Sequence, residues 1–261
     1  MQRWLSLWSL GPDFGPDDLR RVAEIGFRGV EVWGEHARAR EHLQWAWQAG
    51  LQISLHLPFH DLNPVTPDDA VRDRMREVCR QWLVDLSAVG GRHAVIHGGY
   101  AWTSEERDLA VLRSHARLRE LGSWARALGI AVLLENLVPD SLQYTHPIAS
   151  DLTEWLAILD AVELGACLDT GHLAISGPGY PDALEALGAR LQSIHLSDND
   201  RKSDRHLWPG DGLRTTDGFI EALSAAGYDG PIVYEINPYV YERGEILDRA
   251  QREFSVAAEE S

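Results

Sequence analysis

The stretch 105-EERDLAVLRSHARLRELGSWARALGIAVLLE-135 contains two different hydrophobic periodicities. Residues 105–128 place apolar side chains three or four positions apart, which is typical of an amphipathic helix. Residues 129–135 form a short apolar run of the kind found in buried strands, and Gly129 marks the turn between the two segments. The stretch therefore predicts a helix followed directly by a buried strand, which is the repeating unit of α/β proteins.

Similar strand patterns recur along the whole chain. The predicted strands cover residues 3–9, 28–33, 51–57, 92–97, 129–135, 164–169, 191–197 and 231–236. Strands that alternate with helices predict a parallel sheet covered by helices, and eight units suit a closed (β/α)8 TIM barrel of about 250 residues. The alternative is an open doubly wound sheet, but the chain has neither the G-x-G-x-x-G nor the Walker A loop that usually accompanies it. We therefore predict a single TIM-barrel domain over residues 1–261.

The charge balance and the cysteine content restrict the class of protein. The chain has 24 basic and 40 acidic side chains, a formal net charge of −16, which disfavours unspecific attraction to nucleic acid or anionic lipid. No run approaches the roughly 18 apolar residues of a membrane span, and the first residues lack the pattern of a secretion signal. Cys79 and Cys167 lie in apolar segments and are expected to be buried free thiols, as in a reducing compartment. We expect a cytoplasmic protein with no membrane partner; the oligomeric state stays open.

Histidine and carboxylate residues gather at the ends of the predicted strands. In a TIM barrel the active site is built at the carboxyl ends of the strands, so these side chains should converge. The strand ends and the loops after them carry Glu31, His56, His97, Glu135, Asp169, His172, His195, Asp204, His206 and Glu235. Carboxylates brought together without a counter-ion would repel one another, which predicts a bound cation. Imidazole mixed with carboxylate and no cysteine suits Zn²⁺ or Mn²⁺, and also Co²⁺ or Fe²⁺.

The motifs around these residues resemble a known superfamily. They are 56-HLPFHDLNP-64, 95-VIHGG-99, 134-LEN-136, 167-CLDTGH-172, 195-HLSD-198, 204-DRH-206 and 235-EIN-237. In combination they are similar to the xylose isomerase-like TIM barrel superfamily, which contains sugar isomerases and epimerases together with the endonuclease IV family.

The resemblance implies two layers of metal ligands. The isomerases and epimerases hold one divalent ion with a set that matches Glu135, Asp169, His195 and Glu235. The endonuclease IV family holds three zinc ions, and its further ligands match His56, His97, His172, Asp204 and His206. The site is therefore expected to bind one to three ions.

Each of the five further residues also has another interpretation. His56 and His97 could donate hydrogen bonds to substrate hydroxyl groups instead of binding metal. His172 could orient a neighbouring carboxylate ligand, and Asp204 and His206 could form an ordinary hydrogen-bonded pair within their loop. The sequence leaves these alternatives open.

Other residues near the strand ends are candidate substrate contacts. Trp8, Trp33 and Trp208 offer apolar ring faces that could stack on a sugar or a base, although packing within loops would also explain them. Glu31 lies near the end of the second predicted strand. Arg205 belongs to a basic segment between the last two strands, where barrels often bind phosphate, although a solvated charged loop would look the same.

Three functions compete. In the first, a metal-dependent isomerase or epimerase acts on a sugar or sugar phosphate, with Glu135 and Glu235 transferring the carbon-bound proton. In the second, an endonuclease IV-like zinc hydrolase (an AP endonuclease) cleaves a phosphodiester, and the third is a non-catalytic metal- or sugar-binding barrel. The acidic charge and the short loops after the second and third strands favour the first function with a small carbohydrate substrate. Nucleic acid would be a partner only for the second function.

Overall fold

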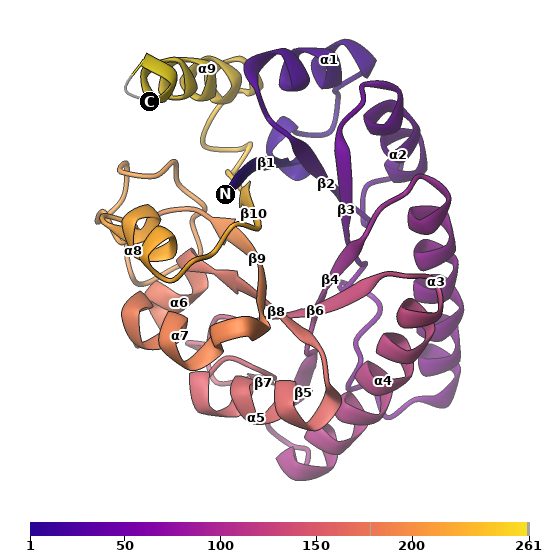
Figure 1. Cartoon of the computed structure of the whole chain (residues 1–261). Coiled ribbons are helices and arrows are strands. Elements are labelled where there is room, and N and C mark those ends of the chain that lie inside the picture. The colour runs from indigo at the N-terminus through magenta and orange to yellow at the C-terminus, as the bar shows by residue number, and fades with distance from the viewer. Residues whose placement is uncertain (178, 260–261) are drawn as a thin grey trace.

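A closed barrel of parallel strands forms the centre of the molecule, with helices around it (Figure 1). The computed structural model describes residues 1–177 and 179–259. In the order in which they pair, the barrel strands are β1 (Gln2–Ser6), β10 (Pro231–Tyr234), β9 (Leu191–Leu196), β8 (Gly165–Asp169), β6 (Ala131–Glu135), β4 (His93–His97), β3 (Gln52–His56) and β2 (Gly29–Trp33). The predicted (β/α)8 barrel is confirmed. The prediction of one domain over residues 1–261 extends to residues 178 and 260–261, which lie outside the described part.

The helices follow the strands as the periodicity predicts. They are α1 (Pro16–Ile25), α2 (Ala39–Gln48), α3 (Asp69–Ala88), α4 (Arg107–Ala127), α5 (Leu152–Val162), α6 (Thr170–Ser176), α7 (Tyr180–Leu187), α8 (Phe219–Ala225) and α9 (Arg243–Glu259), with short 3-10 helices η1 (Leu7–Leu10) and η2 (Gly188–Arg190). Asp68 caps α3 by accepting the main-chain N–H of Ala70 and of Val71 at 2.8 and 3.0 Å, so the side chain satisfies donors that the first turn leaves free. None of the helices in the described part is long and apolar enough to cross a membrane.

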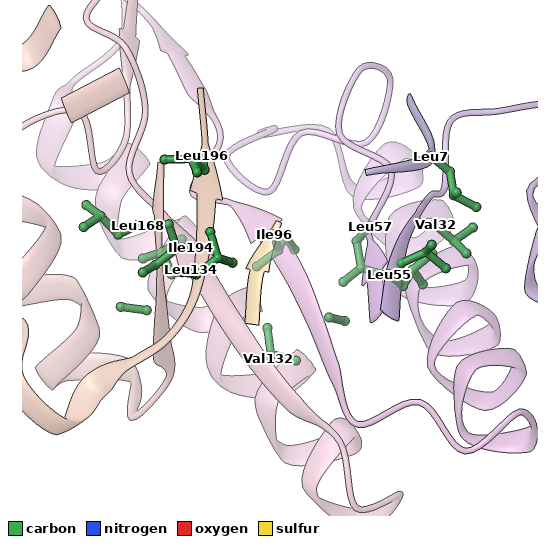
Figure 2. Close-up of a cluster of buried hydrophobic side chains, with 14 of the residues drawn as sticks. Leu7, Val32, Leu55, Leu57, Ile96, Val132, Leu134, Leu168, Ile194 and Leu196 are labelled. Atoms are coloured by element: carbon green, nitrogen blue, oxygen red, sulfur yellow. The ribbon is translucent and has the colours of Figure 1, made fainter. Parts of the chain in front are cut away.

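Alternation along the strands separates two apolar layers. The larger layer lies between the barrel and the helices, and Figure 2 shows part of it: Leu7, Val32, Leu55, Leu57, Ile96, Val132, Leu134, Leu168, Ile194 and Leu196. The smaller layer consists of Val95, Leu133 and Cys167, which lie two residues before His97, Glu135 and Asp169 on the same strands. Because side chains two apart share a face of a strand, the strand-end residues point into the same interior, above this apolar layer.

The first strand is shorter than predicted. The apolar run 3–9 is a strand only to Ser6, and Leu7–Leu10 form η1. Leu7 and Leu10 are buried against the core. A short apolar run does not by itself distinguish a strand from a helical turn, and here the turn carries Trp8 over the barrel.

A second, small sheet lies outside the barrel and was not predicted. Strands β5 (Tyr100–Trp102) and β7 (Thr145–Pro147) pair antiparallel and connect the loops that follow β4 and β6. Three-residue strands carry too little periodicity to be recognised in a sequence. The expected free thiols are confirmed, since Cys79 and Cys167 are both buried and unpaired.

Candidate metal centre

A cavity of about 890 Å³ opens among the loops that follow the barrel strands. Its lining includes ligand-type residues from six separate segments: His56, His97, Glu135, His172, Asp204, His206 and Glu235. Asp169 and His195 lie beneath them, and neither side chain has any exposed surface. The structure thus brings all nine candidate ligands together at the end of the barrel where the parallel strands finish.

The central group consists of Glu135, Asp169, His195 and Glu235. One donor atom from each residue lies within 4.8 Å of the donor atoms of the other three. Nδ1 of His195 is 3.0 Å from a carboxylate oxygen of Glu235 and 3.3 Å from one of Glu135. Oδ2 of Asp169 is buried without any hydrogen-bond partner in the described residues. Three buried carboxylates and an imidazole with an unsatisfied oxygen fit a divalent cation, which needs such donors and neutralises their charge.

A second group forms on one side of the central group. Oε2 of Glu135 lies 3.2 Å from Nε2 of His56 and 3.3 Å from Nε2 of His97, and the three residues satisfy the spacing of a metal site. Oε1 of Glu135 faces the other way, towards His195. Glu135 therefore belongs to both groups, and each of its oxygens would be available to a different cation.

His172, Asp204 and His206 form a third group. Oδ2 of Asp204 lies 3.2 Å from Nε2 of His172 and 3.0 Å from Nε2 of His206. The other ring nitrogen of each histidine contacts a main-chain carbonyl, Asn136 O at 2.8 Å and Glu235 O at 3.2 Å.

His56 repeats this arrangement, because its Nδ1 lies 3.0 Å from the carbonyl oxygen of Leu57. A carbonyl accepts a hydrogen bond only from a protonated nitrogen, so Nδ1 carries a proton and Nε2 is the nitrogen whose lone pair would bind a cation. Metal-binding histidines usually have this second hydrogen bond, and the geometry favours ligand roles for His56, His172 and His206.

The electrostatics of the cluster follow from burial and from its neighbours. Burial raises the pKa of Asp169 to about 6. Burial also opposes ionisation of Glu235, but the nearby His195 outweighs it and lowers the pKa of Glu235 to about 2. For His206, the carboxylate of Asp204 outweighs burial and raises the imidazole pKa to about 9. The neighbouring carboxylates also outweigh burial and raise the pKa of His56, His172 and His195. Protons on these histidines and on His206 therefore balance the carboxylates in the metal-free protein, and binding of cations would displace them.

The loop that carries Asp204 and His206 is organised by Asp198, which is fully buried. Its Oδ2 accepts the main-chain N–H groups of Gly210, Gly212 and Arg214 at 3.0–3.2 Å. Its Oδ1 accepts the main-chain N–H of Asn199 and, from Thr215, both the main-chain N–H and the hydroxyl, at 2.8–3.1 Å. No role was predicted for Asp198, although a carboxylate directly after a predicted buried strand was a usable indication.

The predicted substrate contacts are divided between the cavity and its surroundings. Trp8 and Trp33 line the cavity, with ring centroids 6.0 Å apart. Trp208 does not line it, because its ring is buried against Tyr234 at a centroid distance of 5.5 Å.

Glu31 and Arg205 also lie away from the cavity lining. Glu31 is buried inside the barrel, where Nε2 of His195 lies 2.9 Å from its Oε1. Arg205 is exposed and faces Asp200, at 3.9 Å, on its own loop. Neither residue is positioned to contact a molecule in the cavity.

Several cavity residues were not identified from the sequence as substrate contacts. They include Phe59, His60, Tyr100, Asp140 and Tyr239. Lys202 also lines the cavity and belongs to the basic segment that was considered for phosphate binding. Phe59 and His60 belong to the motif 56-HLPFH-60 and could have been inferred from it. Lys202 is exposed and is the only lysine of the chain. Asp140 and Tyr239 lie on irregular loops, whose paths no periodicity predicts.

The chain is similar to several known proteins. It is 22% identical over 231 residues to fructoselysine 3-epimerase from Escherichia coli O157:H7, which covers 84% of each chain. It is 25% identical over 221 residues to "probable endonuclease 4" from Mycobacterium ulcerans, covering 82% of this chain and 84% of the relative. The structure of D-allulose 3-epimerase from Methylomonas sp. in complex with D-allulose superposes with a TM-score of 0.77 at 21% identity, covering 98% and 96% of the two chains. The family model described as "Xylose isomerase-like TIM barrel" matches residues 19–255, and the chain belongs to this family.

Proposed function

We propose that this protein is a metal-dependent isomerase or epimerase of a sugar or sugar phosphate. The observation that carries the proposal is the central group, in which Glu135 and Glu235 reach the cavity from β6 and from the end of β10. Asp169 and His195 complete the donor set from below. One carboxylate is available on each side of a substrate held over this group.

Glu135, Asp169, His195 and Glu235 would hold a divalent ion, with Zn²⁺ or Mn²⁺ and also Co²⁺ or Fe²⁺ compatible with the donors. When bound, such an ion stabilises negative charge on the oxygens of an open-chain sugar. One of the two glutamates then removes the proton from the carbon next to the carbonyl group, and the other returns a proton. Trp8 and Trp33 supply an apolar wall that suits the C–H face of a sugar.

The family and the names of the relatives support an enzyme of this kind. Two of the similar proteins are named as 3-epimerases, of fructoselysine and of D-allulose, and the second is described in complex with D-allulose. Both are similar over most of the chain. A small carbohydrate is therefore the proposed partner.

Hydrogen exchange tests the proposal before the true substrate is known. The protein is loaded with Mn²⁺ or Co²⁺ and incubated in deuterated water with a panel of ketoses and ketose phosphates. We expect deuterium at a carbon next to the carbonyl of at least one sugar, measured by mass spectrometry and NMR. Glu235→Gln should abolish this incorporation, whereas Glu221→Gln, which removes an exposed carboxylate on α8, should keep it.

An endonuclease IV-like phosphodiester hydrolase is the second candidate. The observation in its favour is the presence of three donor groups that share Glu135, which suits two or three clustered zinc ions. Such a cluster would activate water and neutralise the attacked phosphate. The net charge of −16 disfavours binding to DNA phosphates.

Two measurements separate the candidates. Zinc titration should pass one equivalent if His56, His97, His172, Asp204 and His206 are ligands. Saturation at one equivalent would make them substrate-binding or orienting residues instead. Cleavage of an abasic-site DNA duplex that falls steeply as salt rises, together with no exchange into any ketose, would overturn the epimerase proposal.

A further inference from the structure

Glu31 is a buried carboxylate that the proposed reaction does not use. It stands in the middle of β2, is 1% exposed, and accepts a hydrogen bond from the hydroxyl of Ser54 at 3.1 Å. Its other oxygen, Oε1, lies 2.9 Å from Nε2 of His195. Neither Oε1 nor Nε2 has a well-aligned hydrogen bond to any group in the described residues. These two atoms therefore face each other at a distance suited to a hydrogen bond.

The side of the barrel interior around Glu31 is polar. Ser6 and Ser54 are the register partners of Glu31 on β1 and β3, and both are buried. Ser193, two residues before His195 on β9, is also fully buried. Branched apolar side chains usually fill a barrel interior, and Val95 and Leu133 fill it in this way on β4 and β6. A buried carboxylate among serines is unfavourable for packing alone, which indicates a role directed at His195.

His195 also differs from the other candidate histidine ligands in its orientation. His56, His172 and His206 contact a carbonyl through Nδ1 and present Nε2 to the cavity. His195 is reversed, because its Nδ1 faces Glu135 and Glu235 while its Nε2 faces Glu31. A carboxylate behind a histidine ligand fixes the tautomer and makes the ring a stronger donor.

We propose that Glu31 is a positioning residue that accepts the Nε2 proton of His195 and so directs the Nδ1 lone pair into the central group. This role rests on the proposed metal site. It specifies that Nδ1 of His195 would bind the ion and that Glu31 selects this nitrogen. The thiol of Cys167 also adjoins His195. A neutral thiol is a weak hydrogen-bond partner, so it does not replace the carboxylate.

Metal affinity in the intact chain provides the first test. Competition with a chromophoric chelator gives the Zn²⁺ affinity of the wild type, Glu31→Gln and Glu24→Gln. Glu24 is an exposed residue of α1, so its substitution controls for the loss of one negative charge. We expect Glu31→Gln to weaken binding 10- to 100-fold, the range typical of residues behind a metal ligand, and Glu24→Gln to leave it unchanged.

A spectroscopic test needs no substitution in Glu31. In protein with ¹⁵N-labelled histidine, the zinc-bound wild type should show a protonated Nε2 and a metal-bound Nδ1 for His195, assigned by comparison with His195→Asn. A metal-bound Nε2 in His195, or equal zinc affinity for Glu31→Gln and Glu24→Gln, would overturn the role of Glu31. A wild-type chain that binds no divalent ion would instead overturn the metal site on which the proposed function depends.

Discussion

Asp169 and Asp204 are the same type of residue beside the same cavity, but the fold holds them in different ways. Asp169 ends strand β8 and is fully buried, and its main-chain groups are hydrogen-bonded to the side chain of Asn136 at 2.8 and 3.1 Å. The side chain of Asp204 is 35% exposed, on a loop whose conformation depends on Asp198.

This difference separates two classes of ligand. The register of the barrel places the central group, because strand-end residues on neighbouring strands must meet. The loop residues Asp204 and His206 lie between two segments that Asp198 joins. Its carboxylate accepts from residue 199 and residues 210–215, and its main chain pairs with Leu207. We therefore expect that the two parts of the site can be perturbed independently, and the following predictions test that expectation.

The largest effect is expected at the centre. Asp169→Asn should weaken binding of the central ion by at least about 100-fold and abolish activity, because an amide is uncharged and a poor ligand for the cation. The amide oxygen can still accept the N–H of His172, as the carboxylate does at 2.6 Å, so the fold should persist. Metal content after dialysis and circular dichroism measure the two expectations. Asp229→Asn, at an exposed turn before β10, should behave as wild type, and full metal occupancy in Asp169→Asn would refute the central assignment.

An intermediate effect is expected at Asp198, which supports the loop of Asp204 and His206. Asp198→Asn should lower the free energy of unfolding by about 3 kcal/mol, since an amide cannot replace a carboxylate that accepts six hydrogen bonds. Zinc bound through His172, Asp204 and His206 should be lost, while the central ion is retained. Urea denaturation and zinc stoichiometry check both points. Loss of the central ion in this variant would show that the two parts of the site are not independent.

The carboxylate of Asp198 also makes the stability of the fold depend on pH. Burial opposes ionisation of Asp198, but the hydrogen bonds from Thr215, Asn199 and Gly210 outweigh it and lower its pKa in the folded protein. The stabilisation is therefore present above the pKa of an unfolded aspartate, about 3.9, and is lost as the pH falls through the lower folded value. In urea denaturation, the difference in stability between the wild type and Asp198→Asn should shrink as the pH falls below about 4.

The smallest effect is expected at the rim of the cavity. Lys202 lines the cavity, whereas Arg205 of the same loop does not. If the substrate is a sugar phosphate, Lys202→Ala should raise its KM about fivefold, the size of a solvent-exposed ion pair of about 1 kcal/mol, and should leave the KM of the unphosphorylated sugar unchanged. Arg205→Ala is the matched control with no expected effect. The reverse result would assign phosphate recognition to Arg205.

The periodicity of the sequence was sufficient to predict the barrel and the convergence of most of the candidate ligands. Strand ends in a parallel barrel converge whatever the detail of the loops, so Glu135, Asp169 and His195 could be placed together from their positions in the predicted strands. The same reasoning was less reliable for Trp208, which follows a strand but packs against Tyr234. A residue on a loop is placed by contacts that periodicity does not encode.

What the sequence determined by itself was therefore the order of strands and helices and the convergence of histidines and carboxylates at one end of the barrel. Both follow from local spacing, because side chains two apart in a strand share a face. Only the tertiary structure decided that Glu31 faces His195 rather than the cavity, and that Asp198 supports the loop of Asp204 and His206. Those roles depend on atoms distant in the sequence coming within hydrogen-bond distance, which packing of the whole barrel determines.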